Sequence, residues 1–194
     1  MIKTGAQCVN PKTGSQWKLL AGTEETKGTG FTIEVRCKPK AAADVTEHIH
    51  LSWEERFEIV AGSAFYQLDG KMQQATAGET ILMPAKLKHI HPWNAGEEEM
   101  VYRQVAKFDL PNSEATDEII GTFFTLFDLE AQGKLNKKGL PKNPLQFAAT
   151  LRSLTRHEGY DAAVPITLQN VLAASLGRLS HKMGYRAVSH EVVK

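Results

Sequence analysis

The chain has 194 residues, enough for one main domain of ordinary size with a small addition. Its formal net charge is +1 and 23% of its residues are charged, so the composition gives no general attraction to nucleic acid. Two cysteines, Cys8 and Cys37, are too few for a disulfide framework. No apolar run is long enough for a membrane-spanning helix or a secretory signal, so we expect a cytoplasmic protein without a membrane anchor.

From residue 5 to about residue 108, short segments of alternating apolar and polar residues are separated by turn residues. These segments read AQCV, SQWKLL, FTIEVRC, RFEIV, AFYQL, TILMP and EMVYRQVAKF. Alternation with a period of two is typical of strands that bury one face. Many short strands at this spacing predict a sandwich or a barrel, and nothing in the pattern favours a doubly wound parallel sheet.

After residue 111 the spacing of apolar residues changes to that of helices. We expect helices within 112–133, 143–159 and 165–184, because each range opens with a capping residue or a proline and closes at a glycine. The sequence therefore predicts a mainly β domain at 1–110 and a helical extension at 111–194. The extension is expected to pack on the β domain or to contribute to a dimer interface.

Four of the seven histidines lie in two copies of the tripeptide His-Ile-His, at 48–50 and 89–91. Side chains two positions apart on a strand point to the same side, so His48 and His50 share one face, as do His89 and His91. If that face is the inside of a barrel, at least three imidazoles can converge on one point. Neutral imidazole is the commonest protein ligand of first-row metals.

An acidic residue at the start of the next apolar segment strengthens this interpretation. Glu55 opens ERFEIV, in which Phe57 and Ile59 have the same parity and are expected to face the interior. A carboxylate among apolar neighbours is costly unless it is paired or bound to a metal. We therefore take Glu55 to be part of the histidine cluster.

The spacing within two motifs is more specific than the residue types. Residues 48–62 read His-x-His, four residues, Glu, six residues, Gly, and residues 78–94 contain Gly, five residues, Pro, four residues, His. Across roughly residues 25–108 the chain resembles the cupin superfamily, and its helical extension is similar to that of a subgroup of uncharacterised bacterial single-domain cupins. The resemblance implies a double-stranded β-helix, or jelly-roll, barrel. It also implies one divalent metal ion per chain, Fe, Mn, Zn, Ni or Cu, bound by His48, His50, Glu55 and His89.

Two departures from the second motif leave the register at 89–91 open. Lys86 stands where the motif usually has glycine, and Asn94 lies five residues after His89 rather than four. His91 is therefore an alternative fourth ligand, or a group that supports the ligands from behind. One extra residue at this point predicts a β-bulge.

Three further residues are candidates for the mouth of the pocket. Trp53 lies between the histidine motif and Glu55, where it could gate the barrel or cover its rim. Lys86 and Lys88 precede His89; they form either a solvated edge or a pair of cations that favours an anionic ligand.

Two functions are compatible with such a cluster. In the first, the protein is a mononuclear metal enzyme of the dioxygenase, isomerase or decarboxylase type acting on a small organic molecule in the barrel, with Glu55 as ligand and candidate catalytic base. In the second, the same cup binds or senses a small ligand without turnover. Because barrels of this kind expose sheet faces and edges, we also expect a homodimer.

Overall fold

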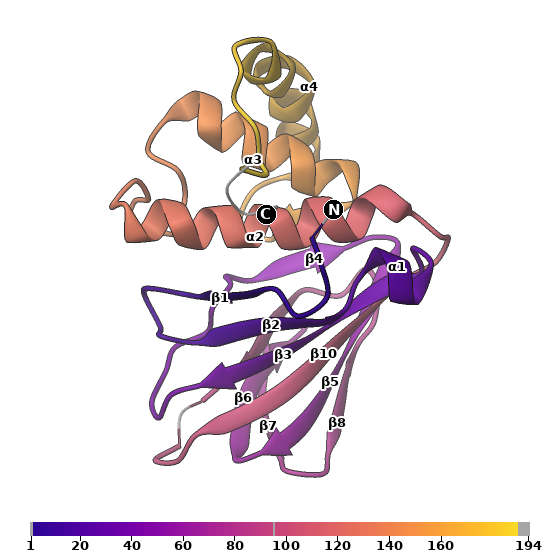
Figure 1. Cartoon of the computed structure of the whole chain (residues 1–194), viewed down its shortest axis with the longest axis vertical. Coiled ribbons are helices and arrows are strands. Elements are labelled where there is room, and N and C mark those ends of the chain that lie inside the picture. Colours follow the sequence, from indigo (N-terminus) through magenta and orange to yellow (C-terminus); the bar gives the residue numbers. More distant parts are fainter. Residues whose placement is uncertain (1, 95, 190–194) are drawn as a thin grey trace.

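The computed structural model describes residues 2–94 and 96–189 of the chain. Within these residues, eleven strands form two antiparallel sheets that enclose a barrel. The longer helices are stacked together at one end of the barrel, with α2 lying across that end (Figure 1). This is the jelly-roll barrel with a helical extension that the sequence predicts.

The larger sheet has six strands and includes the first and last long strands of the barrel. Its strand order is β1 (Gln7–Val9), β2 (Gln16–Ala21), β3 (Gly30–Cys37), β10 (Met100–Phe108), β5 (Trp53–Ala61) and β8 (Thr80–Met83). The central strands β3, β10 and β5 alternate buried and exposed side chains, as period-two segments should.

The second sheet carries both His-Ile-His tripeptides. Its strand order is β11 (Gly159–Asp161), β4 (His48–His50), β9 (His89–Trp93), β6 (Ser63–Leu68) and β7 (Lys71–Thr76). His48 of β4 pairs directly with His89 of β9. The two copies of the tripeptide therefore lie side by side, although 38 residues of chain separate them.

Apolar side chains from the larger sheet fill the barrel. The side chains of Ile33, Val35, Phe57 and Ile59 are at most 2% exposed, and Tyr102 is 1% exposed. These side chains form the packed core of the barrel.

The helices are α1 (Thr23–Thr26), α2 (Ser113–Ala131), α3 (Pro144–Arg156) and α4 (Ile166–Lys182). Asn112 caps α2 and Asn143 caps α3, each through side-chain hydrogen bonds from two backbone N–H groups of the first turn. Among the described residues, no helix combines the length and the apolar character needed to cross a membrane.

One element of the helical extension was not predicted. Residues 157–158 end α3, and Gly159–Asp161 then form β11, which pairs with β4 in the register Gly159 to His50 and Asp161 to His48. The second helix therefore ends three residues earlier than expected.

The domain boundary at residue 110 stays a prediction, because β11 joins the extension to the sheet that carries the histidines.

Two positive φ angles explain how the motif turns are made. Gly62 has φ +77°, and a Cβ there would lie 2.7 Å from the carbonyl oxygen of Glu99, so the position requires glycine. Lys86 has φ +70° although it is not glycine. Its backbone N–H donates to the carbonyl oxygen of His50 at 2.6 Å, which ties this turn to β4.

Replacing Lys86 by glycine should stabilise the protein. A non-glycine residue in the left-handed region destabilises the folded state by about 1–2 kcal/mol. Glycine removes this strain, but its extra freedom in the unfolded chain offsets about 0.5–1 kcal/mol of the gain. We expect Lys86→Gly to raise the free energy of unfolding by about 0.5–1 kcal/mol, measured by denaturant titration. The control is Lys88→Gly. Lys88 is exposed and has no positive φ, so this substitution should lower the free energy of unfolding. Equal effects of the two substitutions would contradict this reading of the turn.

Candidate metal centre

Glu55 lies at the centre of the polar cluster inside the barrel. It belongs to β5, and its side chain has the same parity as Trp53, Phe57 and Ile59, all of which are buried. Glu55 itself is only 1% exposed. Because alternate residues of β5 face the interior, the carboxylate of Glu55 lies among apolar side chains.

Imidazole groups from two strands surround this carboxylate. The Oε2 atom of Glu55 lies 3.1 Å from Nε2 of His89, 2.8 Å from Nε2 of His91 and 3.8 Å from Nδ1 of His50. One ligand atom from each of His48, Glu55, His89 and His91 lies within 4.8 Å of all the others. The structure therefore brings His48, Glu55 and His89 together, and adds His91 to that group.

Backbone carbonyl groups orient two of these histidines. Nδ1 of His48 lies 2.8 Å from the carbonyl oxygen of Thr46, and Nδ1 of His89 lies 2.9 Å from that of Leu87. A carbonyl oxygen can only accept, so Nδ1 carries the hydrogen in both rings. Nε2 of His48 is left with a free lone pair, the arrangement commonly found behind metal-ligating histidines, whereas Nε2 of His89 faces Oε2 of Glu55.

A bulge in β9 lies beside the inward-facing pair His89 and His91. β6 pairs Phe65 with Trp93 but Gln67 with Ile90, so β9 has one more residue than β6 over this interval. The expected bulge is thus found at His91 and Pro92. Both histidine side chains are buried, and their rings are nearly parallel, 5.8 Å apart.

His50 is held differently from the other three histidines. Its ring stacks on the indole of Trp53, with centroids 3.4 Å apart and planes inclined by 14°. The Trp53 Nε1–H in turn donates to the carbonyl oxygen of His157 at 2.9 Å. Trp53 is thus a buried support at the start of β5, and its hydrogen bond links the cluster to the end of α3.

Sequence reasoning missed Gln104, which holds the other oxygen of Glu55. Its Nε2–H donates to Oε1 of Glu55, and its side chain is 3% exposed. Gln104 lies on β10 with the same parity as Tyr102 and Ala106, which are both buried. That parity, within the predicted strand EMVYRQVAKF, was the signal that could have found it.

Burial and charge act in opposite directions on the ionisable groups. Burial alone would raise the pKa of Glu55, but the charges of His91 and His50 and hydrogen bonds from His89 and His91 hold that pKa well below its usual value. Burial lowers the pKa of His48 well below its usual value and that of His50 to about 3. For His89, hydrogen bonding and attraction to Glu55 outweigh burial and raise the pKa. Near neutral pH the cluster thus contains an ionised carboxylate and at least two neutral imidazoles.

The donor set fits a divalent first-row metal ion. Neutral imidazole nitrogens and a carboxylate oxygen are the ligands that such ions prefer. Three buried polar atoms of this cluster have no hydrogen-bond partner among the described residues: Nδ1 of His50, Nδ1 of His91 and Oε1 of Gln104. Buried polar atoms normally have a hydrogen-bond partner, so these unpaired atoms indicate that a further group can bind in the cluster.

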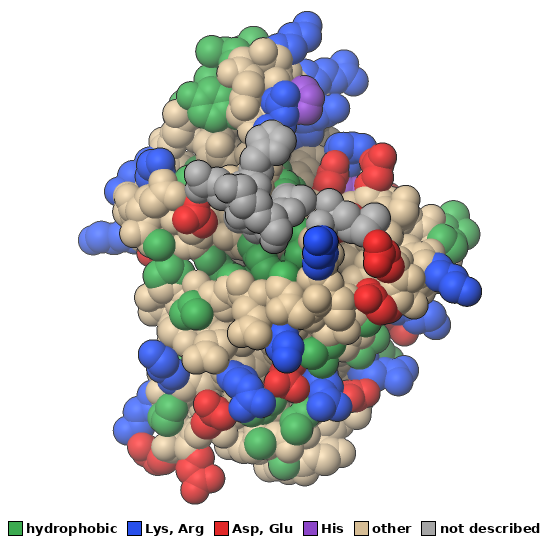
Figure 2. All heavy atoms as spheres, viewed as in Figure 1, with side chains coloured by type: hydrophobic (Ala, Val, Ile, Leu, Met, Phe, Trp, Pro, Cys, Tyr) green, Lys and Arg blue, Asp and Glu red, His purple; other side chains and the backbone are tan. Residues whose placement is uncertain are grey.

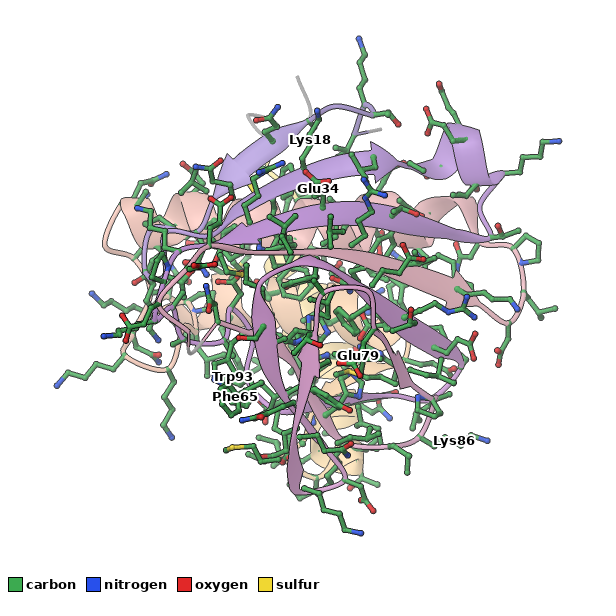
Figure 3. All side chains as sticks on the ribbon, turned by 90° about the horizontal axis from the view of Figure 1, so that it is seen from below. Lys18, Glu34, Phe65, Glu79, Lys86 and Trp93 are labelled. Atoms are coloured by element: carbon green, nitrogen blue, oxygen red, sulfur yellow. The ribbon has the colours of Figure 1, made fainter. Side chains whose placement is uncertain are left out.

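The two lysines of the second motif lie apart from the cluster. Lys86 and Lys88 are exposed, and Lys86 projects away from the barrel (Figure 3). A cavity of about 300 Å³ borders the cluster instead on the side of the helices, where His48, His50 and Trp53 form part of its wall. Neither lysine is among the residues that line this cavity.

Comparisons with known proteins identify the barrel. Residues 34–106 match the family model described as Cupin domain. Among solved structures, a predicted oxalate decarboxylase from Thermotoga maritima is 16% identical over 56% of this chain and 98% of its own, with a TM-score of 0.47. KdgF from Halomonas sp. is 19% identical over 56% of this chain and 88% of its own, with a TM-score of 0.43. No curated protein matches the chain. At such identities and scores, these structures carry no statement about reaction or ligand.

Removing the amide of Gln104 should weaken metal binding without unfolding the barrel. Gln104→Leu leaves Oε1 of Glu55 without its donor, and loss of such an outer partner typically lowers metal affinity about 10- to 100-fold. Competition with a chromophoric chelator measures the affinity. Gln74→Leu, the same substitution at an exposed position of β7, is the control and should bind as the unmodified protein does. Equal affinities of the two variants would remove Gln104 from the site.

Proposed function

Because the chain belongs to the cupin superfamily, we propose that it binds one divalent metal ion and acts as an enzyme on a small organic molecule. The ligands in this proposal are His48, Glu55, His89 and His91. His50 stands beside them, stacked on Trp53, and supports the set. The ion is Fe, Mn, Zn, Ni or Cu, all of which accept imidazole and carboxylate ligands.

The buried carboxylate of Glu55 is the observation that carries the proposal. An ionised carboxylate that is 1% exposed needs a compensating positive charge or several donors. Its neighbours His48 and His50 resist protonation, because burial lowers the pKa of both. His89 can carry part of this charge, because hydrogen bonding and attraction to Glu55 raise its pKa. A divalent cation would supply a larger compensating charge and would also use the lone pairs of the neutral imidazoles.

The chain's own residues define what the site can do. A bound divalent ion would supply Lewis-acid chemistry or, if redox-active, electron transfer to a substrate. Glu55 holds its position through Gln104 on one oxygen and the histidines on the other. A role for Glu55 as a base, also expected from the sequence, requires its carboxylate to leave one of these partners. His48 and His50 line the adjoining cavity, through which a substrate reaches the cluster.

Metal analysis of variants tests the ligand set. The protein is expected to bind one divalent ion per chain, and His91→Ala should lower the affinity by more than the 10- to 100-fold typical of an outer partner. His50→Ala is the matched control, and its loss of metal affinity should be about 10- to 100-fold or smaller. If His50→Ala empties the site while His91→Ala keeps it, the ligands are instead His48, His50, Glu55 and His89. Metal-loaded protein is then screened with small organic acids and sugars, with and without O₂. Saturable binding without consumption would favour the non-catalytic alternative.

We also propose that the protein forms a homodimer through α4. Five large apolar side chains on one side of this helix are 42–62% exposed, namely Leu168, Val171, Leu176 and Leu179 of the helix and Met183 at its C-cap. Figure 2 shows hydrophobic side chains together at the top of the molecule, the end that α4 occupies in Figure 1. The proposed occupant of this face is α4 of a second copy, because an apolar stripe buries most completely against its own equivalent.

Light scattering at micromolar concentration tests the dimer. The expected mass is about twice the chain mass of 21.5 kDa. Leu179→Glu should give the monomer mass, because it places a charge in the apolar stripe. Leu110→Glu, at a position 78% exposed outside α4, should leave the dimer intact. A monomer mass for the unmodified protein would refute the proposal.

A cytoplasmic location is proposed from the two thiols. Cys8 and Cys37 are free, and burial raises the pKa of both, that of Cys37 to about 12. Such thiols stay protonated and unreactive, and they suit a reducing compartment.

A further inference from the structure

The cavity beside the cluster lies between the barrel and the helical extension rather than inside the barrel. The barrel contributes His48, His50 and Trp53 to its wall. The opposite wall comes from α2, α3, α4 and the loop at 135–141. Figure 1 shows the same arrangement, with α2 placed across the end of the barrel and α3 above it. At about 300 Å³ the cavity has the size of a pocket for a small organic molecule.

The wall formed by the helices is apolar. Its main side chains from α2 and α3 are Ile119, Phe123, Phe127, Phe147, Leu151 and Leu154. Three of them, Ile119, Phe127 and Leu151, are less than 10% exposed. A polar group placed against these side chains would lose its water, and Thr150 and Gln169 are the only buried polar side chains that the described parts of α2, α3 and α4 contribute to the lining. A hydrocarbon or aromatic group gains by contact with it.

The polar side of the cavity lies at the barrel. His48 and His50 line it there and present their imidazole rings to this end of the cavity. Charged residues of both signs also line the cavity, namely Lys12, Asp44, Glu130, Lys138 and Asp161. The two lysines are exposed and therefore lie where the cavity meets solvent. The cavity is thus polar at the cluster, apolar along the helices and charged at its rim.

We infer that the ligand of this cavity is a small amphipathic molecule, with an aliphatic or aromatic body against α2 and α3 and an oxygen-bearing end group at His48 and His50. The inference rests on the proposed function, because it assigns the substrate class of the same site. It gives the helical extension a role in specificity. A sugar or a short polyhydroxy acid would bury hydroxyl groups against the phenylalanines and leucines, so these classes are expected to bind more weakly.

Straight-chain primary alcohols test the inference in metal-free protein. They are uncharged, so the lysines and acids at the rim do not select them, and their hydroxyl group can donate to or accept from an imidazole nitrogen. Dissociation constants of butan-1-ol, hexan-1-ol and octan-1-ol are measured by protein NMR titration. Burial of each methylene should strengthen binding about fourfold until the cavity is filled. Imidazole resonances of His48 and His50 should shift, and those of His181, which lies on the exposed side of α4, should not.

Two variants with a matched control locate the site. Leu172→Trp on α4 fills the cavity and should weaken octan-1-ol binding at least tenfold. Leu110→Trp makes the same substitution at an exposed position outside the cavity and should bind as the unmodified protein does. Leu154→Asn, nearly equal in size, puts an amide into the wall and should reduce the gain per methylene. If Leu172→Trp does not fold, the Leu154→Asn variant still tests the inference.

The outcomes separate this inference from the metal proposal. Affinities that do not depend on chain length, or that Leu172→Trp and Leu154→Asn leave unchanged, would overturn the amphipathic ligand even if metal binds as proposed. If the affinity depends on the chain length of the alcohol but the imidazole resonances of His48 and His50 do not shift, the assigned orientation of the ligand is wrong. If the alcohols behave as expected but no metal binds, the cavity assignment stands and the metal proposal fails.

Discussion

The structure depends on the burial of one carboxylate, that of Glu55, within an apolar barrel. An isolated ionised carboxylate could not remain there, because loss of hydration costs far more than a domain can recover elsewhere. Oε2 of Glu55 faces His89 and His91, and Oε1 accepts from Gln104. β5, β9 and β10 must therefore keep their registers, since a slip of one residue on any of them would turn its polar side chain away from the cluster.

The helical extension is connected to this cluster through the backbone as well as by packing. β11 pairs with β4 beside His48 and His50, and Trp53 donates to the carbonyl oxygen of His157 at the end of α3. His157 is itself buried and bonded through Nε2 to Glu118 of α2, at 2.7 Å. The position of α2 and α3 over the cavity thus depends on the same contacts that hold His50 against Trp53.

The second His-Ile-His combines strand parity with a local irregularity. Side chains two positions apart on a strand point the same way, so His89 and His91 both face inward. The bulge adds one residue to β9 relative to β6, and Nε2 of each histidine lies within 3.1 Å of Oε2 of Glu55. Lys86, held with φ +70°, completes the turn that leads into β9, and its N–H fixes that turn to His50.

The sequence by itself determined the strand and helix types, because burial periodicity and capping are local properties of the chain. Strand parity predicted that each His-Ile-His presents both imidazoles to one face, and the resemblance to the cupin motifs implied that His48, His50, Glu55 and His89 come together; the structure groups three of these, His48, Glu55 and His89. Only the tertiary structure decided that His91 joins that group, that Gln104 supports Glu55, and that Gly159–Asp161 form a strand. Each of these depends on a partner strand distant in the sequence. The cavity could not be predicted either, because it exists only where α2 and α3 close over the barrel.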